Sequence, residues 1–194
     1  MKPVAPHRPP LPDRTPPGTG WRKRIEGLIL TLVVVMAAAA PSGALSQTGA
    51  AAVGTATGLP VPRYVALRSG EVNVRTGPGV RYPVEWVFLR KEMPVEITAE
   101  FDTWRRIRDW EGAEGWVHQS MLVGRRNVVV VGDIRALRKS GEAGAAVVAR
   151  AEPGVIGGLQ RCEREWCEVD LAGYRGWVRR AEVWGVYEHE KFPP

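Results

Sequence analysis

Cysteines, histidines and tryptophans are the residues of this 194-residue sequence whose types and spacing could do chemistry. Cys162 and Cys167 are separated by four residues, which suits two strands joined by a tight turn. Cysteines that face each other across such a turn can form a disulfide, whereas a zinc site would need more thiols or a nearby histidine. Besides His7, only His118 and His189 are present, so no zinc triad can be assembled. We predict a structural disulfide, no metal and no cofactor.

Catalysis is disfavoured by the same inventory. A hydrolase that uses cysteine and histidine needs a reactive thiol beside a base, and here each thiol is better explained as the partner of the other. The serines and histidines are too few and too peripheral for a convincing catalytic triad. We therefore expect a protein that is not an enzyme.

Trp104 is the strongest candidate for a binding residue. A fixed, flat aromatic face can stack on a sugar ring or a peptide at little entropic cost. Trp104 and Ile107 are an odd number of positions apart, so in a strand they point to opposite faces. If Ile107 fills the core, Trp104 points outward, and the same count places Val117 inward and His118 outward. The alternative is that Trp104 caps the open end of a small barrel, because a domain of ~60 residues buries only ~60% of its surface.

Three arginines follow Trp104 and admit two interpretations. Arg105, Arg106 and Arg108 could recognise a carboxylate through paired hydrogen bonds. The favoured alternative is that they pair across strands with acidic neighbours, namely Glu100, Asp102 and Asp109.

The segment that contains Trp104 has a degraded copy downstream. The stretch from Glu100 to Leu122 resembles the stretch that starts near Cys162. Matched positions are Trp104 with Trp166, Ile107 with Val169, Gly115-Trp116-Val117 with Gly176-Trp177-Val178, and Leu122 with Val183. Because the offset changes by only one residue at a time, divergent tandem copies are expected.

Short strand-like segments, without any amphipathic helical period, make up both copies. In the first copy they are Tyr64–Leu67, Asn73–Arg75, Val84–Leu89, Val95–Phe101 and the two strands around the turn Glu111–Glu114. Short strands at this spacing indicate a small barrel. We predict an all-β chain with domain 1 over 63–126 and a divergent domain 2 over 127–190.

The first 46 residues have the layout of a secretory signal. A basic cluster at Trp21–Arg24 precedes an apolar core at Leu28–Ala40, and Ala44-Leu45-Ser46 offers a cleavage site. We predict a signal peptide over 1–46 and a flexible linker over 47–62, rich in Ala, Gly and Thr. An uncleaved membrane anchor is the alternative, and the chain would otherwise have no membrane contact.

Removal of the signal changes the charge of the chain. The whole chain has a net charge of +6, but 21 basic and 19 acidic residues follow Ser46. Such a balance is not the pattern of a nucleic-acid-binding protein, so we expect no nucleic-acid partner.

Several motifs together resemble the bacterial SH3-type domain. They are Asn73-Val74-Arg75-Thr76-Gly77-Pro78-Gly79, Tyr82-Pro83, Trp104 with Ile107, and Gly115-Trp116-Val117. The likeness is close over 63–126, where it extends to SH3 domains of exported alphaproteobacterial proteins. It is weaker over 128–187, where the Gly-Pro-Gly loop is replaced.

The resemblance implies two tandem small SH3-like β-barrels used for binding. By analogy with the eukaryotic groove, the ligand site would include Trp104, His118 and Met121, and Tyr82 and Trp110 complete our candidate set. The implied function is an exported, periplasmic or secreted module that binds cell-wall glycan or stem peptide. The alternative is an adaptor that binds an envelope protein.

Overall fold

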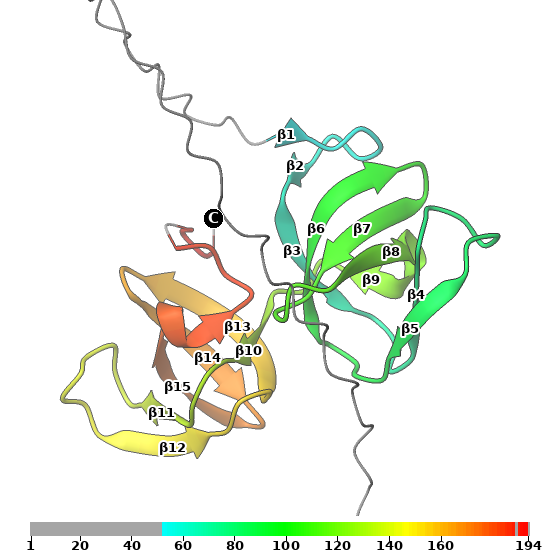
Figure 1. Cartoon of the computed structure of the whole chain (residues 1–194). Helices are drawn as coiled ribbons and strands as arrows, with labels where there is room; N and C mark the ends of the chain where they lie inside the picture. The colour runs from blue at the N-terminus through cyan, green and yellow to red at the C-terminus, as the bar shows by residue number, and fades with distance from the viewer. Residues whose placement is uncertain (1–51, 189, 194) are drawn as a thin grey trace, which may run out of the picture. The chain divides into compact units, whose positions relative to one another are not determined.

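The computed structural model describes residues 52–188 and 190–193 (Figure 1). The predicted signal peptide, 1–46, lies outside the described residues. The strands of the described residues all belong to one compact unit. In the part of the chain that the structure describes, no helix is long and apolar enough to span a membrane.

The first barrel is a seven-stranded sheet in the order β5-β4-β8-β7-β6-β3-β9. A short 3-10 helix, Gln119–Met121, precedes its last strand. The strands are β3 (Arg63–Leu67), β4 (Val72–Arg75), β5 (Val84–Phe88), β6 (Pro94–Phe101), β7 (Trp104–Arg108), β8 (Glu114–His118) and β9 (Leu122–Val123).

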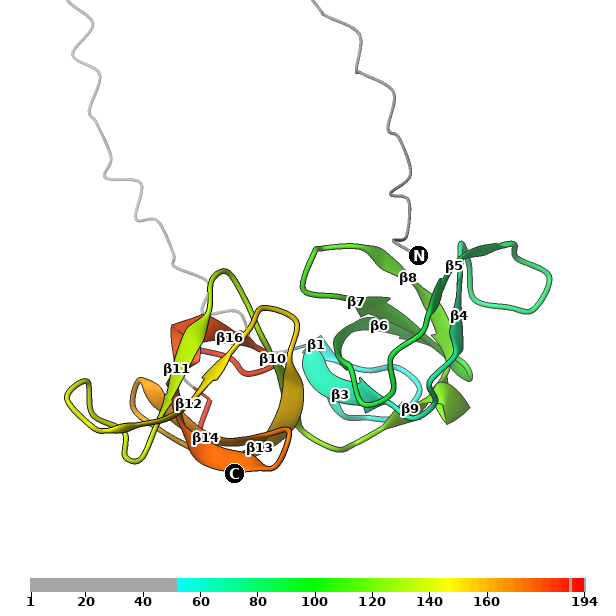
Figure 2. The ribbon, with the colours of Figure 1, turned by 90° about the horizontal axis from the view of Figure 1, so that it is seen from below.

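The second barrel repeats this topology as β12-β11-β15-β14-β13-β10-β16 (Figures 1 and 2). It too has a 3-10 helix, Arg180–Glu182, before its last strand. The strands are β10 (Asn127–Val130), β11 (Arg135–Arg138), β12 (Val147–Ala151), β13 (Ile156–Glu163), β14 (Trp166–Leu171), β15 (Tyr174–Arg179) and β16 (Val183–Trp184). The predicted all-β fold with two tandem SH3-like barrels is confirmed.

Strand register relates the two repeats residue by residue. Arg75 pairs with Trp116 in the first barrel, and Arg138 pairs with Trp177 in the second. The equivalence deduced from the spacing of tryptophans therefore holds in three dimensions.

Each barrel has its own apolar core, and parity assigns the central residues correctly. In the first barrel Ile107 is 1% exposed and Val117 is fully buried. In the second barrel Val169 is also fully buried. The first core consists of Val65, Leu67, Val72, Val74, Met93, Val95, Ile97, Ile107, Val117 and Leu122.

A glycine before the repeated tryptophan allows two strands to approach closely. A Cβ atom on Gly115 would lie 2.3 Å from Cγ1 of Val74. A Cβ atom on Gly176 would lie 2.7 Å from the carbonyl oxygen of Arg138. The Gly-Trp-Val motif therefore starts with the residue that this strand crossing requires.

Residues 52–62 of the predicted flexible linker, 47–62, contain a strand hairpin, and residues 47–51 lie outside the described residues. β1 (Ala52–Val53) and β2 (Pro60–Val61) pair as a hairpin. The carboxylate of Glu100 accepts hydrogen bonds from the backbone N–H groups of Ala56 and Thr57. A segment with little apolar surface is thus ordered by polar contacts with β6.

Cys162 and Cys167 form the predicted disulfide, with Cα atoms 4.0 Å apart. They are directly opposite each other on β13 and β14. The equivalent pair in the first barrel is Glu100 and Arg105, whose charged groups lie 3.6 Å apart. The same register position therefore holds an ion pair in one repeat and a disulfide in the other.

Candidate functional site

Trp104 begins β7 and faces His118, the last residue of β8. The two rings meet edge to face with centroids 5.5 Å apart, and both side chains are half-buried. Phe101, the cross-strand neighbour of Trp104, is 58% exposed. These three side chains form an accessible aromatic cluster, which we call the Trp104 cluster.

Local hydrogen bonds fix the Trp104 cluster. The His118 ring nitrogen Nδ1 lies 2.7 Å from the Ser120 hydroxyl and accepts from the Ser120 N–H, so His118 caps the 3-10 helix. Beneath it, the buried Arg105 donates to the carbonyl oxygen of Trp104 and to the side chain of Gln119. Arg105 is therefore a positioning residue for the ends of β7 and β8.

The other two arginines pair with acids rather than presenting two free guanidinium groups. Arg106 lies 2.6 Å from Glu114, and Arg108 lies 2.5 Å from the buried Glu96. Cross-strand pairing, the favoured interpretation, is therefore found for these two arginines, although with acids other than the expected Asp102 and Asp109. Strand register selects the partner, because Arg108 is directly opposite Glu96.

Glu100 connects the β1–β2 hairpin with Arg105, which lies next to the Trp104 cluster. Burial raises the pKa of its carboxyl group, but hydrogen bonds from Thr57 and Arg63 and from the Ala56 N–H outweigh that effect and lower the pKa to about 2. Arg63 lies 2.7 Å from this carboxylate, whose side chain has no exposed surface. Glu100 is therefore ionised at every physiological pH.

Trp110 and Met121 belong to the candidate set and contact the interior of the first barrel. Both are half-buried and pack against the first apolar core. Trp110 follows β7 at a turn that Asp109 fixes by accepting from the N–H groups of Glu111 and Ala113. These two side chains therefore contribute to packing of the first barrel, whereas Trp104 and His118 lie outside its core cluster.

Tyr82 stabilises the Gly-Pro-Gly loop. A Cβ atom on Gly77 would lie 2.4 Å from the Tyr82 ring, so the ring lies directly across the backbone. Arg75 donates to the carbonyl oxygens of Val80 and Tyr82 and holds the loop from inside. In the second repeat, Arg138 donates to the carbonyl oxygen of Ala145 in the same manner.

The second repeat buries Trp166, the tryptophan that is equivalent to Trp104. Trp166 is only 7% exposed, although it lies outside the second core cluster. Gly141, in the loop after β11, packs against it, and the guanidinium of Arg179 lies 5.1 Å from the ring centroid. The loop after β11, although its sequence differs from the Gly-Pro-Gly loop, therefore still covers the face on which Trp166 lies.

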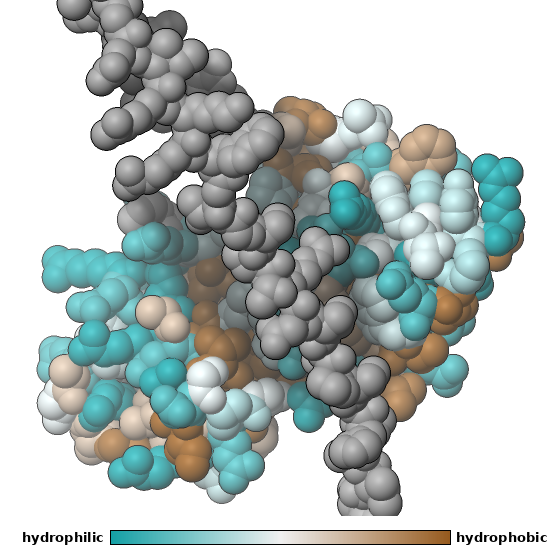
Figure 3. Space-filling model, in the orientation of Figure 1, coloured by the Kyte–Doolittle hydropathy of each residue, from teal (hydrophilic) through white to brown (hydrophobic). Residues whose placement is uncertain are grey.

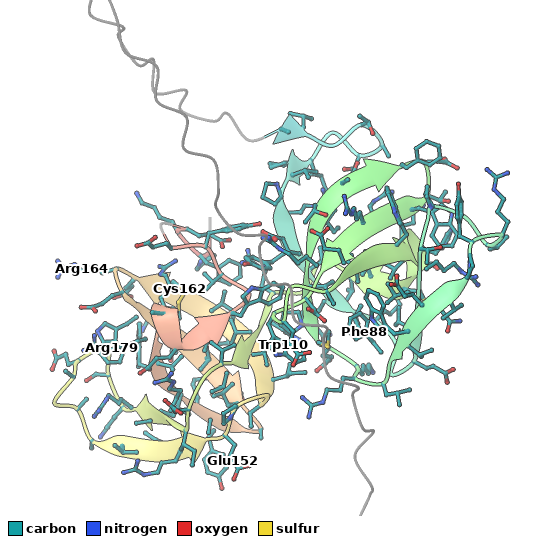
Figure 4. The ribbon with its side chains drawn as sticks, viewed as in Figure 1. Phe88, Trp110, Glu152, Cys162, Arg164 and Arg179 are labelled. Atoms are coloured by element: carbon teal, nitrogen blue, oxygen red, sulfur yellow. A yellow bond between two sulfur atoms is a disulfide. The ribbon has the colours of Figure 1, made fainter. Side chains whose placement is uncertain are left out.

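A hollow of about 620 Å³ lies beside Trp166. Figure 4 labels Arg164, which lines it, at the turn between β13 and β14. Trp177 also lines this hollow, so its equivalent, Trp116, belongs to the same face of the first barrel. Our candidate set omitted Trp116, although the repeat pattern and strand parity could have identified it. The other lining residues are Lys139, Ser140, Gly141, Glu142, Arg161, Glu163 and Glu165.

Two half-buried tyrosines and the buried Glu96 form a separate polar cluster. The Tyr187 hydroxyl donates to the Glu96 carboxylate at 2.9 Å, and the rings of Tyr64 and Tyr187 have centroids 4.5 Å apart. Burial, followed by the charge of Glu96, raises the pKa of Tyr64 to about 12. Burial, followed by the hydrogen bond to Glu96, also raises the pKa of Tyr187, so both tyrosines are neutral at physiological pH. Within the described residues, no group of three or more His, Cys, Asp or Glu side chains is arranged to hold a metal ion.

The fold and the Trp104 cluster define a small β-barrel of the kind used for binding. The family model described as "Bacterial SH3 domain" matches residues 68–124 and 131–185. The chain belongs to the bacterial SH3 domain family. Domains of this family are typically non-catalytic binding modules.

Comparisons beyond the family give little further information. No curated protein matches the chain. Among solved structures, NlpC2 from Trichomonas vaginalis is 9% identical with a TM-score of 0.31, over 67% of this chain and 50% of that chain. NlpC1 from the same organism is 9% identical with a TM-score of 0.31, over 68% of this chain and 49% of that chain. The chain thus spans about half the length of each of these proteins.

Proposed function

We propose that this protein is an exported, non-catalytic binding module of the cell envelope, and that its first barrel binds cell-wall glycan or stem peptide. The observation that carries the proposal is the Trp104 cluster. It presents a half-buried indole, held edge to face by His118, beside the exposed ring of Phe101. Sugar rings and peptide backbones bind to such rigid aromatic faces because little side-chain entropy is lost.

The surroundings of the cluster favour a neutral or mixed-charge ligand. The nearby arginines are engaged, since Arg105 donates to Trp104 and Gln119, and Arg106 pairs with Glu114. A ligand would therefore gain its affinity from stacking and from hydrogen bonds rather than from a cluster of free charges. Wall glycan and its attached peptides supply both kinds of contact.

Co-sedimentation of the full chain with purified peptidoglycan sacculi tests the proposal. We expect the protein to pellet with intact sacculi and to be released by soluble wall fragments added in excess. A chain that stays in the supernatant, while it co-purifies with a defined envelope protein, would instead favour an adaptor and contradict wall binding.

A further inference from the structure

The second barrel contains an apolar hollow at a place where the first barrel has aromatic side chains. The hollow measures about 510 Å³ and is lined on β12 and the β14–β15 turn by Ala149, Ala151 and Ala172. It reaches the barrel interior, because the core residues Leu137 and Leu171 also line it. It lies outside the Trp104 cluster and is independent of the wall-binding proposal.

Register identifies what the first repeat has at these three positions. Val74 pairs with Trp86 where Leu137 pairs with Ala149. By the same pairing, Phe88 corresponds to Ala151.

The third position follows from the neighbouring strands. Glu96 pairs with Arg108 where Gly158 pairs with Asp170, so two residues further on Trp110 corresponds to Ala172. Three large aromatic residues of the first barrel are thus three alanines in the second.

The aromatic residues of the first barrel show that large rings fit at the positions equivalent to the hollow. Trp86, Phe88 and Trp110 all pack against the first core, and the rings of Trp86 and Phe88 meet edge to face at 6.0 Å. Figure 4 labels Phe88 and Trp110 on the first barrel, and Glu152, which lines the hollow, on the second. Among the described residues of the second barrel, the partly buried apolar side chains that pack against the equivalent core are Ala149, Val155 and Phe192.

The rim of the hollow is accessible and includes a free strand edge. Among the strands that the structure describes, β12 pairs only with β11 and ends its sheet. Val148 and Tyr174 at the rim are 45% and 58% exposed. Figure 3 shows apolar side chains at the surface in the region of the β11–β12 hairpin, at the lower left of the view. An edge strand beside an apolar hollow is suited to strand addition by an extended peptide.

Charge on the rim restricts the peptide further. Arg150 and Glu152 are exposed and line the hollow. Neither forms an ion pair within 52–188 and 190–193. In an antiparallel strand, a residue opposite Ala151 shares its inward face, and the two residues beside it lie opposite Glu152 and Arg150.

We propose that the second barrel binds an extended segment of a partner protein that inserts one aromatic side chain into this hollow. The segment adds to β12 and has a basic residue before the aromatic residue and an acidic residue after it. The inserted ring contacts Leu137 and Leu171 and occupies the space that Trp86 and Phe88 fill in the first repeat.

A fluorinated peptide tests the proposal on the full chain. The probe is acetyl-Thr-Lys-Trp-Glu-Thr-amide with 5-fluorotryptophan, followed by ¹⁹F NMR during titration. Unlabelled peptide should displace the probe, and the same peptide with alanine in place of tryptophan should be weaker by on the order of thirtyfold, the effect of losing a buried aromatic anchor.

Ala149→Trp should fill the hollow and weaken binding of the probe by tenfold or more, by the same arithmetic. Val147→Trp adds the same side chain on the same strand outside the hollow and should leave binding unchanged. If thermal unfolding shows that Ala149→Trp does not fold, Ala151→Phe replaces it. The reverse change, Trp86→Ala, should open the first repeat and add a second bound ¹⁹F signal.

Three results would overturn the proposal. They are equal displacement by the tryptophan and alanine peptides, unchanged binding to the folded Ala149→Trp chain, and a dimer in sedimentation velocity that Ala149→Trp dissociates. The last result would assign the hollow to a second copy of this chain.

Discussion

At the scale of single residues, Trp104 and Ile107 lie three positions apart in one strand and differ in burial. Both belong to β7, yet Ile107 is 1% exposed and Trp104 is half-buried beside His118. Pleating alone accounts for the difference, because an odd separation places side chains on opposite faces. Mutations at these positions should therefore have different consequences.

Ile107→Ala and Val117→Ala should each lower the free energy of unfolding by roughly 2–4 kcal/mol, since truncation leaves a cavity in the core. Trp104→Ala should cost less, because its ring lies outside that core. Urea unfolding of the full chain and the three variants measures the difference. Equal losses at all three positions would mean that Trp104 is a packing residue.

Parity predicted the side on which each residue lies but not how much of it is exposed. Trp166 lies outside the second core as predicted, yet it is 7% exposed because Gly141 and Arg179 cover it. Trp110 and Met121, which are also candidate residues, pack against the core. Exposure depends on loops from elsewhere in the chain, which strand periodicity does not describe.

Glu100 should make stability depend on pH in the acid range. Its pKa of about 2 in the folded chain lies below its ordinary value of 4.5, so the unfolded chain binds the proton first as pH falls. The contribution of Glu100 is therefore complete above about pH 5 and is lost between 4.5 and 2.

Urea unfolding of the wild-type chain and of Glu100→Gln between pH 6 and pH 2 measures this dependence. We expect the two stability curves to differ at the upper end and to converge toward the lower end. The exposed Glu142→Gln is the control and should follow the wild type throughout. A constant gap between wild type and Glu100→Gln would contradict the assignment.

At the scale of elements, the hairpins differ in how they are stabilised. The end of the β6–β7 hairpin has the Glu100–Arg105 pair, and the end of the β13–β14 hairpin has the disulfide. Short segments with turn residues between them predicted these hairpins from sequence. The β1–β2 hairpin was not predicted, because its order comes from hydrogen bonds to Glu100, more than forty residues away.

Replacement of both Cys162 and Cys167 by alanine should lower the free energy of unfolding by ~2 kcal/mol at most, since the closed loop is small. Comparison of the variant with the oxidised and reduced wild type by urea unfolding measures this. Titration of free thiols in unfolded, unreduced protein should find none. Two thiols per chain would show that the bond does not form in solution.

At the scale of the whole molecule, two matching sheets with different surfaces suggest divided roles. The tandem arrangement was predictable because its landmarks, such as Gly-Trp-Val, are fixed by close strand crossings. The aromatic-to-alanine changes on β12 were not recognised, because strand register is needed to align those positions. The surfaces differ because the first barrel has the accessible Trp104 cluster and the second has an open apolar hollow.

Export should yield a mature chain that begins near Gln47. Cell fractionation followed by N-terminal sequencing of the exported form checks this expectation. The full-length chain found only with ribosomes and cytosolic enzymes would contradict the export proposal, while leaving the two barrels and the disulfide unaffected.

The affinity of Trp104→Ala for sacculi, relative to the wild type, tests the central claim most directly. Leu89→Ala is the control, because Leu89 is apolar, 77% exposed and outside the Trp104 cluster. A stacked aromatic anchor is typically worth about 2 kcal/mol or more, so Trp104→Ala should weaken sacculus binding about thirtyfold. The unfolding curve of Trp104→Ala should stay close to that of the wild type, and Leu89→Ala should bind sacculi as the wild type does. Binding by folded Trp104→Ala that equals the wild type would contradict the claim that the first barrel binds the cell wall through this cluster.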